Sequence, residues 1–101
     1  NNRALGMVKQ WQDMQYGGRY SSISYEDSLP DFVKLAESFG HVGLKVEKFS
    51  DLNDAMEEAF SLKDKLVFLD VLIDPDEHVY PMLEAGGSMS EMRISKKDKT
   101  F

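Results

Sequence analysis

Apolar residues recur every three to four positions near the start of the chain, which is the spacing of a helix with one apolar face. The pattern predicts a helix from Gly6 to about Gln15, and Gly17 and Gly18 end it. The following residues 17–29 are rich in Gly, Ser and Tyr and predict a loop. The apolar positions of this first helix are Leu5, Met7, Val8, Trp11, Met14 and Tyr16.

A second helical pattern follows the loop. Ser28 is expected to cap it, with Pro30 tolerated in its first turn. Its apolar face ends at Phe39, and Gly40 suits the position after a helix because glycine adopts a left-handed backbone without strain. His41 comes next, near the negative end of the helix dipole, and is expected to have a structural role.

The middle of the chain has the pattern of a βαβ unit. Residues 42–47 alternate between apolar and other side chains, and residues 66–73 form a nearly continuous apolar run. Such a run favours a strand that is buried on both faces of a parallel sheet. Ser50 is expected to open the intervening helix, which spans 51–62, and the crossover is expected to be right-handed. The predicted buried stripe of that helix is Leu52, Ala55, Met56, Ala59 and Phe60.

The predicted fold class is α/β, with residues 1–73 as part of a domain and residues 74–101 as an extended arm and loose tail. The arm contains Pro75 and Pro81 and has no clear period. Two strands and about three helices are few for a free-standing domain, because strands buried on both faces need neighbours. Since the first residue is also Asn rather than Met, we expect the C-terminal piece of a larger α/β domain.

Composition narrows the classes of function. The 101 residues include 12 Lys and Arg against 18 Asp and Glu, a net charge of −6, which argues against a nucleic-acid partner. Cysteine is absent, which excludes disulfides, thiolate nucleophiles and cysteine-based metal sites. The apolar run at 66–73 is too short to cross a bilayer. We therefore expect a soluble, intracellular protein with neither a nucleic-acid nor a membrane partner.

Two titratable residues invite a chemical interpretation. His78 stands among Asp74, Asp76 and Glu77, but the regular spacing of a calcium loop is missing, so a solvated acidic turn is expected. Asp70 interrupts an apolar run, and such residues are mostly paired and structural. Neither position predicts a catalytic group.

Spacing alone leaves two other positions open. Trp11 is expected in a core, with a pocket wall as the alternative. Asn1 and Asn2 are expected to act in a turn or cap, although an amide oxygen is also a neutral hard ligand that suits Mg²⁺. Periodicity does not decide between these alternatives.

Three separated blocks occur in an order that resembles the C-terminal end of the catalytic subunit of the acetohydroxyacid synthase (acetolactate synthase) family. They are NNRALGMVKQWQDMQYGGRYS, SLPDFVKLAESFGHVGLKV and HVYPMLEAGGSMSEM. The resemblance covers essentially the whole chain and is weakest at 48–64 and after Arg93. This family carries a motif that begins with Gly-Asp-Gly and ends in Asn-Asn, and Asn1-Asn2 matches its end. The resemblance implies that 1–73 belong to a thiamine diphosphate-binding domain and that 74–101 form an arm over the active site.

The resemblance also implies roles for individual residues. The side chain of Asn2 and the backbone carbonyl of Ala4 would be Mg²⁺ ligands, and the metal would hold the diphosphate of thiamine diphosphate. Met7 and Val8 would line the cofactor and substrate cavity. No catalytic residue of this segment is implied. The substrate channel would include Trp11, Gln15, where the family commonly has an aromatic or aliphatic residue, and Ala85.

The implied reaction is the decarboxylation of pyruvate and the joining of its two-carbon unit to a second 2-keto acid, pyruvate or 2-ketobutyrate. This reaction serves valine, leucine and isoleucine biosynthesis. FAD and the carboxylate that activates the cofactor would bind or lie outside this chain, so we expect the chain alone to be inactive. Implied partners are the remainder of the catalytic subunit, a second catalytic subunit and a regulatory small subunit.

Two other functions are compatible with parts of the pattern. One is a different thiamine diphosphate-dependent decarboxylase or carboligase, against which Trp11 and the HVYPM block argue. The other is a small α/β interaction module without enzymatic activity, against which the missing neighbours of the sheet argue.

Overall fold

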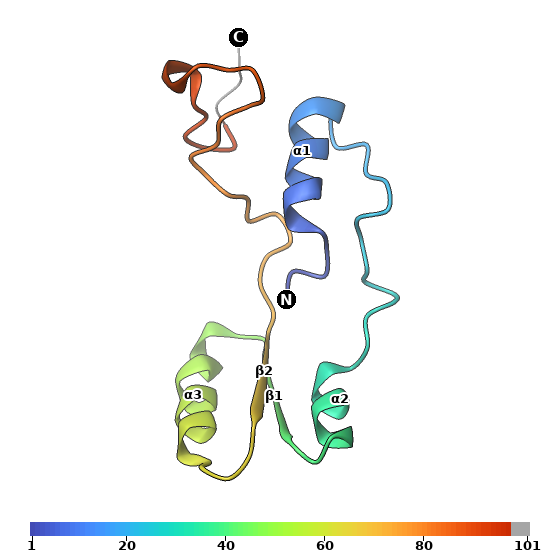
Figure 1. The fold of residues 1–101 in the computed structure, drawn as a ribbon, viewed down its shortest axis with the longest axis vertical. Helices are drawn as coiled ribbons and strands as arrows, with labels where there is room; N and C mark the ends of the chain where they lie inside the picture. The colour runs from blue at the N-terminus through green and yellow to red at the C-terminus, as the bar shows by residue number, and fades with distance from the viewer. Residues whose placement is uncertain (98–101) are drawn as a thin grey trace. The chain divides into compact units, whose positions relative to one another are not determined.

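The computed structural model describes residues 1–97. These residues belong to two compact units, one made of residues 1–4 and 24–75 and the other of residues 5–23 and the chain from 76 onward. No helix in the described part is both long and apolar enough to span a membrane. The elements in chain order are α1 (Gly6–Tyr16), α2 (Phe32–Ser38), β1 (Val42–Val46), η1 (Phe49–Asp51), α3 (Leu52–Ser61), β2 (Val67–Val71) and η2 (Met89–Glu91) (Figure 1).

The first unit contains the predicted βαβ arrangement. β1 and β2 are parallel, and their register runs from Val42 opposite Val67 to Val46 opposite Val71. The two helices α2 and α3 lie on opposite faces of this sheet (Figure 1). A parallel pair covered by helices on both faces is the α/β architecture that the sequence predicts, and this prediction is confirmed.

Asn1 pairs with the other edge of β2. Its terminal ammonium donates to the carbonyl of Val71 at 2.7 Å, and the N–H of Ile73 donates to the carbonyl of Asn1 at 3.1 Å. Because the N–H of Leu72 donates to Val46 in β1, these two groups point to the opposite edge of β2. The first four residues are therefore held at the carboxyl end of β2.

The structure corrects the predicted start of α2. The cap is Asp31, whose carboxylate accepts a hydrogen bond from the N–H of Lys34 at 3.1 Å. Ser28 instead donates its hydroxyl to the carbonyl of Tyr25 within the preceding turn. The predicted end is confirmed, because Gly40 follows the helix with a φ of 75°.

A glycine allows α2 to approach the sheet closely. A Cβ atom at Gly43 in β1 would lie 2.6 Å from the Cα of Val33 and 2.7 Å from its carbonyl oxygen. Both are backbone atoms and have little freedom to move. The close contact therefore depends on the absence of a side chain at this position.

Both the start and the packing of α3 differ from the prediction. Ser50 lies within η1, and its hydroxyl donates to the carboxylate of Asp51 at 2.7 Å rather than capping α3. The predicted buried stripe is only partly covered, since Met56 is 38% exposed and Phe60 69% exposed. A sheet of two strands is too narrow to cover the whole apolar face of a helix.

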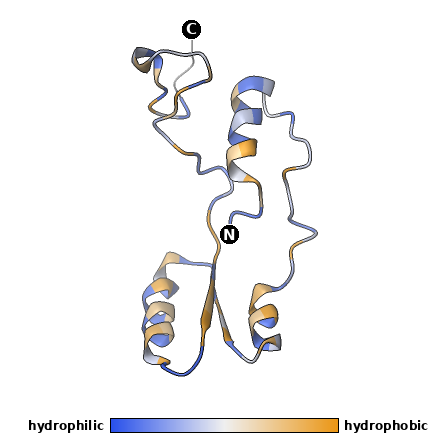
Figure 2. Ribbon diagram, in the orientation of Figure 1, coloured by the Kyte–Doolittle hydropathy of each residue, from blue (hydrophilic) through white to orange (hydrophobic). Residues whose placement is uncertain are grey.

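The same narrowness affects β2, which was expected to be buried on both faces. Phe68 is 48% exposed, although its ring stacks on that of Phe32 in α2 with centroids 5.9 Å apart. Figure 2 shows that the strands of this unit are among its most hydrophobic segments. The buried hydrophobic residues of the described chain are few, namely Ile23, Ala36 and Val46.

The arm is folded rather than extended between Met82 and Arg93. The backbones of these two residues exchange hydrogen bonds of 2.8 and 2.9 Å, and Arg93 also pairs with Glu84 at 2.5 Å. The capping box of η2, between Ser88 and Glu91, lies inside this closed loop. The predicted tail continues into residues 98–101, which lie outside the described residues.

Candidate functional site

The predicted metal ligands lie in a tight turn at the start of the chain. The side-chain oxygen of Asn1 accepts a hydrogen bond from the N–H of Arg3 at 3.1 Å, and that of Asn2 accepts one from Ala4 at 3.2 Å. Arg3 has a φ of 55°, in the left-handed region. The turn role that spacing favours for both asparagines is therefore present.

Ala4 is oriented by pairing with Ser24. The N–H of Tyr25 donates to Arg3 at 3.0 Å and the N–H of Leu5 donates to Ile23 at 3.0 Å, which are the bonds on either side of an antiparallel bridge. Since these flanking groups point toward the partner segment, the carbonyl of Ala4 points away from it. The backbone oxygen of Ala4 is thus directed to the open side of the turn.

The donor atoms of this turn fit part of a magnesium site. Amide and carbonyl oxygens are hard, neutral ligands, and an amide oxygen that accepts one hydrogen bond retains a second lone pair. The described residues contain no cluster of three or more His, Cys, Asp or Glu side chains suited to a metal ion. Asn2 and Ala4 therefore fit a shared site, to which other residues would add the charged ligands.

The position of this turn in the fold is also relevant. Because Asn1 pairs with the carboxyl end of β2, Asn2 lies just beyond the carboxyl ends of the two parallel strands. In open α/β sheets, ligands bind in this region. The sheet thus places the candidate ligands at its usual binding edge.

The predicted cofactor and channel residues lie on α1. At 100° per residue, Met7, Val8, Trp11 and Gln15 fall within about 100° of the helix circumference, so they share one face. Met7 and Val8 are 45% and 44% exposed, Trp11 is half-buried, and Gln15 is exposed. Ala85, also predicted for the channel, lies exposed in the loop closed by Met82 and Arg93.

The opposite face of α1 is polar and is the buried one. Lys9 is 8% exposed and Gln10 1% exposed, although periodicity predicts the apolar face to be inside. Gln10 holds the backbone of Val79 with both ends of its amide, donating to the carbonyl at 2.8 Å and accepting from the N–H at 2.9 Å. Lys9 forms an ion pair with Asp76 and lies 4.9 Å from the ring centroid of Tyr20.

His78 also contacts the buried polar face of α1. The prediction that it lies in a solvated turn is wrong. Its side chain is only 2% exposed, and its Nε2 lies 2.6 Å from a carboxylate oxygen of Asp13 on α1. The other oxygen of Asp13 accepts a hydrogen bond from the hydroxyl of Tyr20 at 2.5 Å. We call residues 76–79, which carry these contacts, the strap.

The electrostatics of this cluster follow from its pairing. Burial alone would raise the pKa of Asp13, but the hydrogen bonds from Tyr20 and His78 outweigh it, so the pKa lies below its ordinary value. The hydrogen bond to Asp76 raises the pKa of Lys9, and the same bond lowers the pKa of Asp76. The Lys9–Asp76 pair thus favours the charged forms of both residues.

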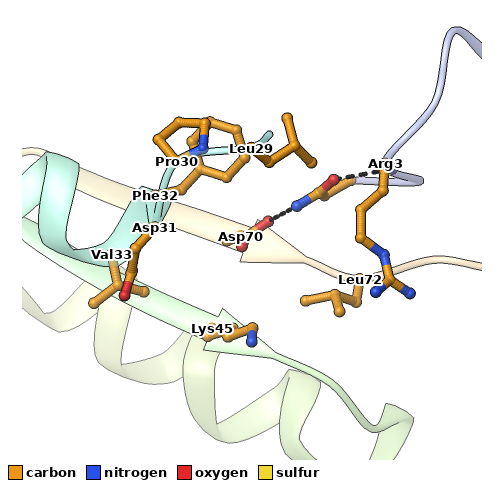
Figure 3. Close-up of a pocket in the computed structure, with 10 residues that line it drawn as sticks. Arg3, Leu29, Pro30, Asp31, Phe32, Val33, Lys45, Asp70 and Leu72 are labelled. Carbon is orange, nitrogen blue, oxygen red and sulfur yellow. Dashed lines mark hydrogen bonds between the residues drawn. The ribbon is translucent and has the colours of Figure 1, made fainter. Parts of the chain in front are cut away.

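The first unit also has an open pocket of about 530 Å³, which sequence reasoning did not identify (Figure 3). Asn1, Asp31 and Lys45 are among the residues that line it, and the side-chain amide of Asn1 donates to Asp70 at 2.9 Å. This bond confirms the structural role expected for Asp70. The pocket contains none of the predicted cofactor or channel residues.

Comparisons with known proteins bear on this site. Residues 1–71 match the family model of the thiamine pyrophosphate enzyme, C-terminal TPP binding domain. The chain is 58% identical over 96 residues to the acetolactate synthase large subunit of Haemophilus influenzae, which covers 95% of this chain and 17% of that protein.

Two further relatives are also acetolactate synthases. Identity is 54% over 102 residues to the acetolactate synthase isozyme 3 large subunit of Escherichia coli, covering 99% of this chain and 18% of that protein. Identity is 40% over 99 residues to an acetolactate synthase of Mycobacterium bovis, covering 95% of this chain and 16% of that protein. The chain thus spans about a sixth of the length of these relatives.

The family model and these relatives cover most of the chain, so the resemblance to the C-terminal part of an acetolactate synthase catalytic subunit is confirmed. The chain belongs to the family of the thiamine pyrophosphate enzyme C-terminal TPP binding domain.

Proposed function

We propose that this chain contributes to an acetolactate synthase that decarboxylates pyruvate and joins the two-carbon unit to pyruvate or 2-ketobutyrate. The observation that carries the proposal is the inverted burial of α1. Its polar face is covered by the strap, while Met7 and Val8 on the other face remain about half exposed. A helix face that stays apolar and uncovered is suited to line a ligand cavity.

Thiamine diphosphate would supply the decarboxylation chemistry, and the role of this chain is to bind and orient. Asn2 and the carbonyl of Ala4 would hold the Mg²⁺ that binds the cofactor's diphosphate. Met7 and Val8 would pack against the cofactor and exclude water from it. Trp11, with Gln15 beside it and Ala85 from the arm, would form the wall of the substrate channel.

The remaining parts of the enzyme lie outside this chain in our proposal. Residues 1–73 belong to the cofactor-binding domain, and residues 74–101 to the arm that folds over the active site. FAD, the rest of the catalytic subunit, a second catalytic subunit and a regulatory small subunit complete the assembly. The reaction would take place in the cytoplasm and serve the synthesis of branched-chain amino acids.

The test compares two proteins, the 101-residue chain and an intact large subunit that contains this segment. With thiamine diphosphate, Mg²⁺ and FAD, the intact subunit is expected to form acetolactate from pyruvate, and the short chain is not. The short chain is also expected to self-associate, since its sheet and α3 leave apolar side chains exposed. Turnover by the short chain near that of the intact subunit would contradict the division of the site.

A further inference from the structure

We propose that His78 is a positioning residue, which together with Asp13 fastens the strap to α1 and so fixes the helix face that carries Trp11. His78 belongs to the HVYPM block and Asp13 to the first block, and they are 65 residues apart in the sequence. The consequence for substrate choice rests on the proposed function. The attachment itself rests on the contacts within the second unit.

Three contacts of different chemistry join the strap to one face of α1. They are the Lys9–Asp76 ion pair, the double hydrogen bond between Gln10 and Val79, and the Asp13–His78 contact of 2.6 Å. The helix partners are spaced i, i+1 and i+4, so they lie on adjacent turns. The strap therefore crosses about one turn of α1 and is held at both ends of that turn.

The three contacts are not equally protected from water. The side chain of Asp76 is 54% exposed, so its ion pair with Lys9 is open to screening. The side chain of His78 is 2% exposed and that of Asp13 21% exposed, so their contact is largely shielded. A charge-assisted hydrogen bond in such surroundings is worth more than a surface ion pair. Of the two contacts between charged partners, the one made by His78 is therefore expected to contribute more to the attachment.

The groups around His78 support a defined proton position. Asp13 faces it from α1, Tyr20 donates to the other oxygen of that carboxylate, and Asp76 lies on the strap itself. The positive charge of Lys9 faces the same cluster from α1. The positive charge of Lys96 helps to lower the pKa of Asp76. An ionised carboxylate can only accept a hydrogen bond, so we infer that the Nε2 of His78 is the donor in this contact.

The Asp13–His78 contact lies on α1 close to Trp11, the residue proposed for the channel wall. Asp13 lies two residues after Trp11 on α1, and the two side chains point to opposite faces of the helix. A strap held by Asp13 limits rotation of the helix about its axis. The strap is also part of the arm, which contains Ala85.

The attachment is tested by hydrogen exchange of the Val79 N–H, which donates to Gln10. In the 101-residue chain, His78→Leu is expected to accelerate this exchange by about tenfold or more, because the contact next to Val79 in the strap is lost. His78→Gln retains a donor and is expected to restore most of the protection. Glu77→Gln, an exposed neighbour, is the matched control and should change nothing. Asp13→Asn provides a second variant should His78→Leu fail to fold.

A spectroscopic signature tests the proton position. The chain has two histidines, so the ring signals of His78 can be assigned by comparison with His78→Gln. Long-range ¹⁵N spectra should show a protonated Nε2 at neutral pH with a ring proton shifted downfield by the carboxylate, and Asp13→Asn should reduce that shift. An unprotonated Nε2, or a Val79 exchange rate unchanged in both His78→Leu and Asp13→Asn, would overturn the proposal.

The consequence for catalysis is tested in an intact large subunit. His78→Leu is expected to lower the preference for 2-ketobutyrate over pyruvate by about threefold or more, and His78→Gln to restore it. Faster Val79 exchange with an unchanged product ratio would overturn the positioning role. Absence of acetolactate formation by the unmodified subunit would instead reject the proposed function, and the exchange result would still decide the attachment.

Discussion

Asn1 donates its side-chain amide to a carboxylate oxygen of Asp70 at 2.9 Å, which joins the first residue of the chain to β2 near the carboxyl end of the strand. Asp70 is 7% exposed in an otherwise apolar strand, so its carboxylate would be costly without a partner. The same asparagine accepts a hydrogen bond from Arg3 through its side-chain oxygen. One side chain thus pairs a buried charge and shapes the turn that carries Asn2.

Removal of this pairing should destabilise the first unit. Asp70→Ala leaves the amide of Asn1 without its acceptor and is expected to lower the free energy of unfolding by about 1–3 kcal/mol. Asp70→Asn keeps an acceptor oxygen and is expected to cost less. Urea unfolding followed by circular dichroism measures both. Equal losses in the two variants would show that the hydrogen bond to Asn1 is not the cause.

Gly43 offers a test of the packing between α2 and β1. In Gly43→Ala the new Cβ meets backbone atoms of Val33 at 2.6 and 2.7 Å, so the helix must move away from the sheet. We expect a loss of about 1–3 kcal/mol in the free energy of unfolding. The control is Lys45→Ala on the same strand, which is exposed and should change stability by about 0.5 kcal/mol or less. A Gly43→Ala variant as stable as this control would contradict the close contact.

The βαβ unit was predictable because its pattern is local. Alternation at 42–47 and the apolar run at 66–73 identify both strands, and the structure places them in parallel register. The start of α2 was missed even though a signal was present. A residue before proline disfavours the helical region, so Leu29 cannot begin a helix, and Asp31 is the next capping residue after Pro30.

The burial of α1 could not be read from periodicity. Hydropathy directs the apolar face of a helix inward, but here the inward face is chosen by a strap more than 60 residues away in the sequence. The available signal was complementarity of charge, since Lys9 and Asp13 on one face match Asp76 and His78. The roles of Asn2 and Ala4 as ligands came from the resemblance alone and stay predictions.

The strap should loosen in acid. The pKa of Asp13 is lower in the folded chain than its ordinary value of about 3.9, so its contribution to stability is complete above that value and is lost as pH falls through the folded pKa. The pKa of Asp76 is also lowered, so its contribution to stability is lost in acid in the same way. The pKa of Lys9 is raised, so its contribution is lost only as pH rises above its ordinary value of 10.5. The pH window of strongest attachment therefore runs from about 4 to about 10.

Protection of the Val79 N–H, corrected for the intrinsic pH dependence of exchange, measures this loosening. Protection is expected to be constant between about pH 5 and 7 and to fall below about pH 4. In Asp13→Asn the fall should be smaller, since only Asp76 then titrates within the cluster in that range. Protection that is unchanged down to pH 2.5 would contradict the role of these carboxylates.

Asn2 is expected to act in cofactor binding. In an intact large subunit, Asn2→Ala removes one oxygen ligand of Mg²⁺ and should weaken the binding of Mg²⁺ and thiamine diphosphate by about tenfold or more, with a sharp fall in turnover. The control is Asn1→Ala, which alters the same turn without removing the proposed ligand. Titration of both cofactors decides the role. Cofactor affinity that falls equally in the two variants would assign the effect to the turn rather than to a ligand.

Substitution of Trp11 tests whether this residue belongs to a core or to the wall of the substrate channel. A Trp→Leu change in a core costs about 2–4 kcal/mol of stability, because a large buried apolar area is lost. Trp11 is only half-buried and shares its helix face with the exposed Met7 and Val8. In an intact large subunit we therefore expect Trp11→Leu to leave the fold nearly intact. It should instead lower the preference for 2-ketobutyrate over pyruvate by about tenfold or more, since one methylene of fit in an apolar pocket is worth roughly 10–200-fold.

The measurement is a competition between the two keto acids, with a melting curve on the same variant. Gln15→Leu provides a comparison on the same helix face, because it adds apolar surface about one turn from Trp11 without removing the indole. It is expected to retain the preference for 2-ketobutyrate. If the indole contacts the added methyl group of 2-ketobutyrate, the product ratio must change while the melting temperature does not. A large fall in melting temperature with an unchanged product ratio would place Trp11 in the core and reject its assignment to the channel.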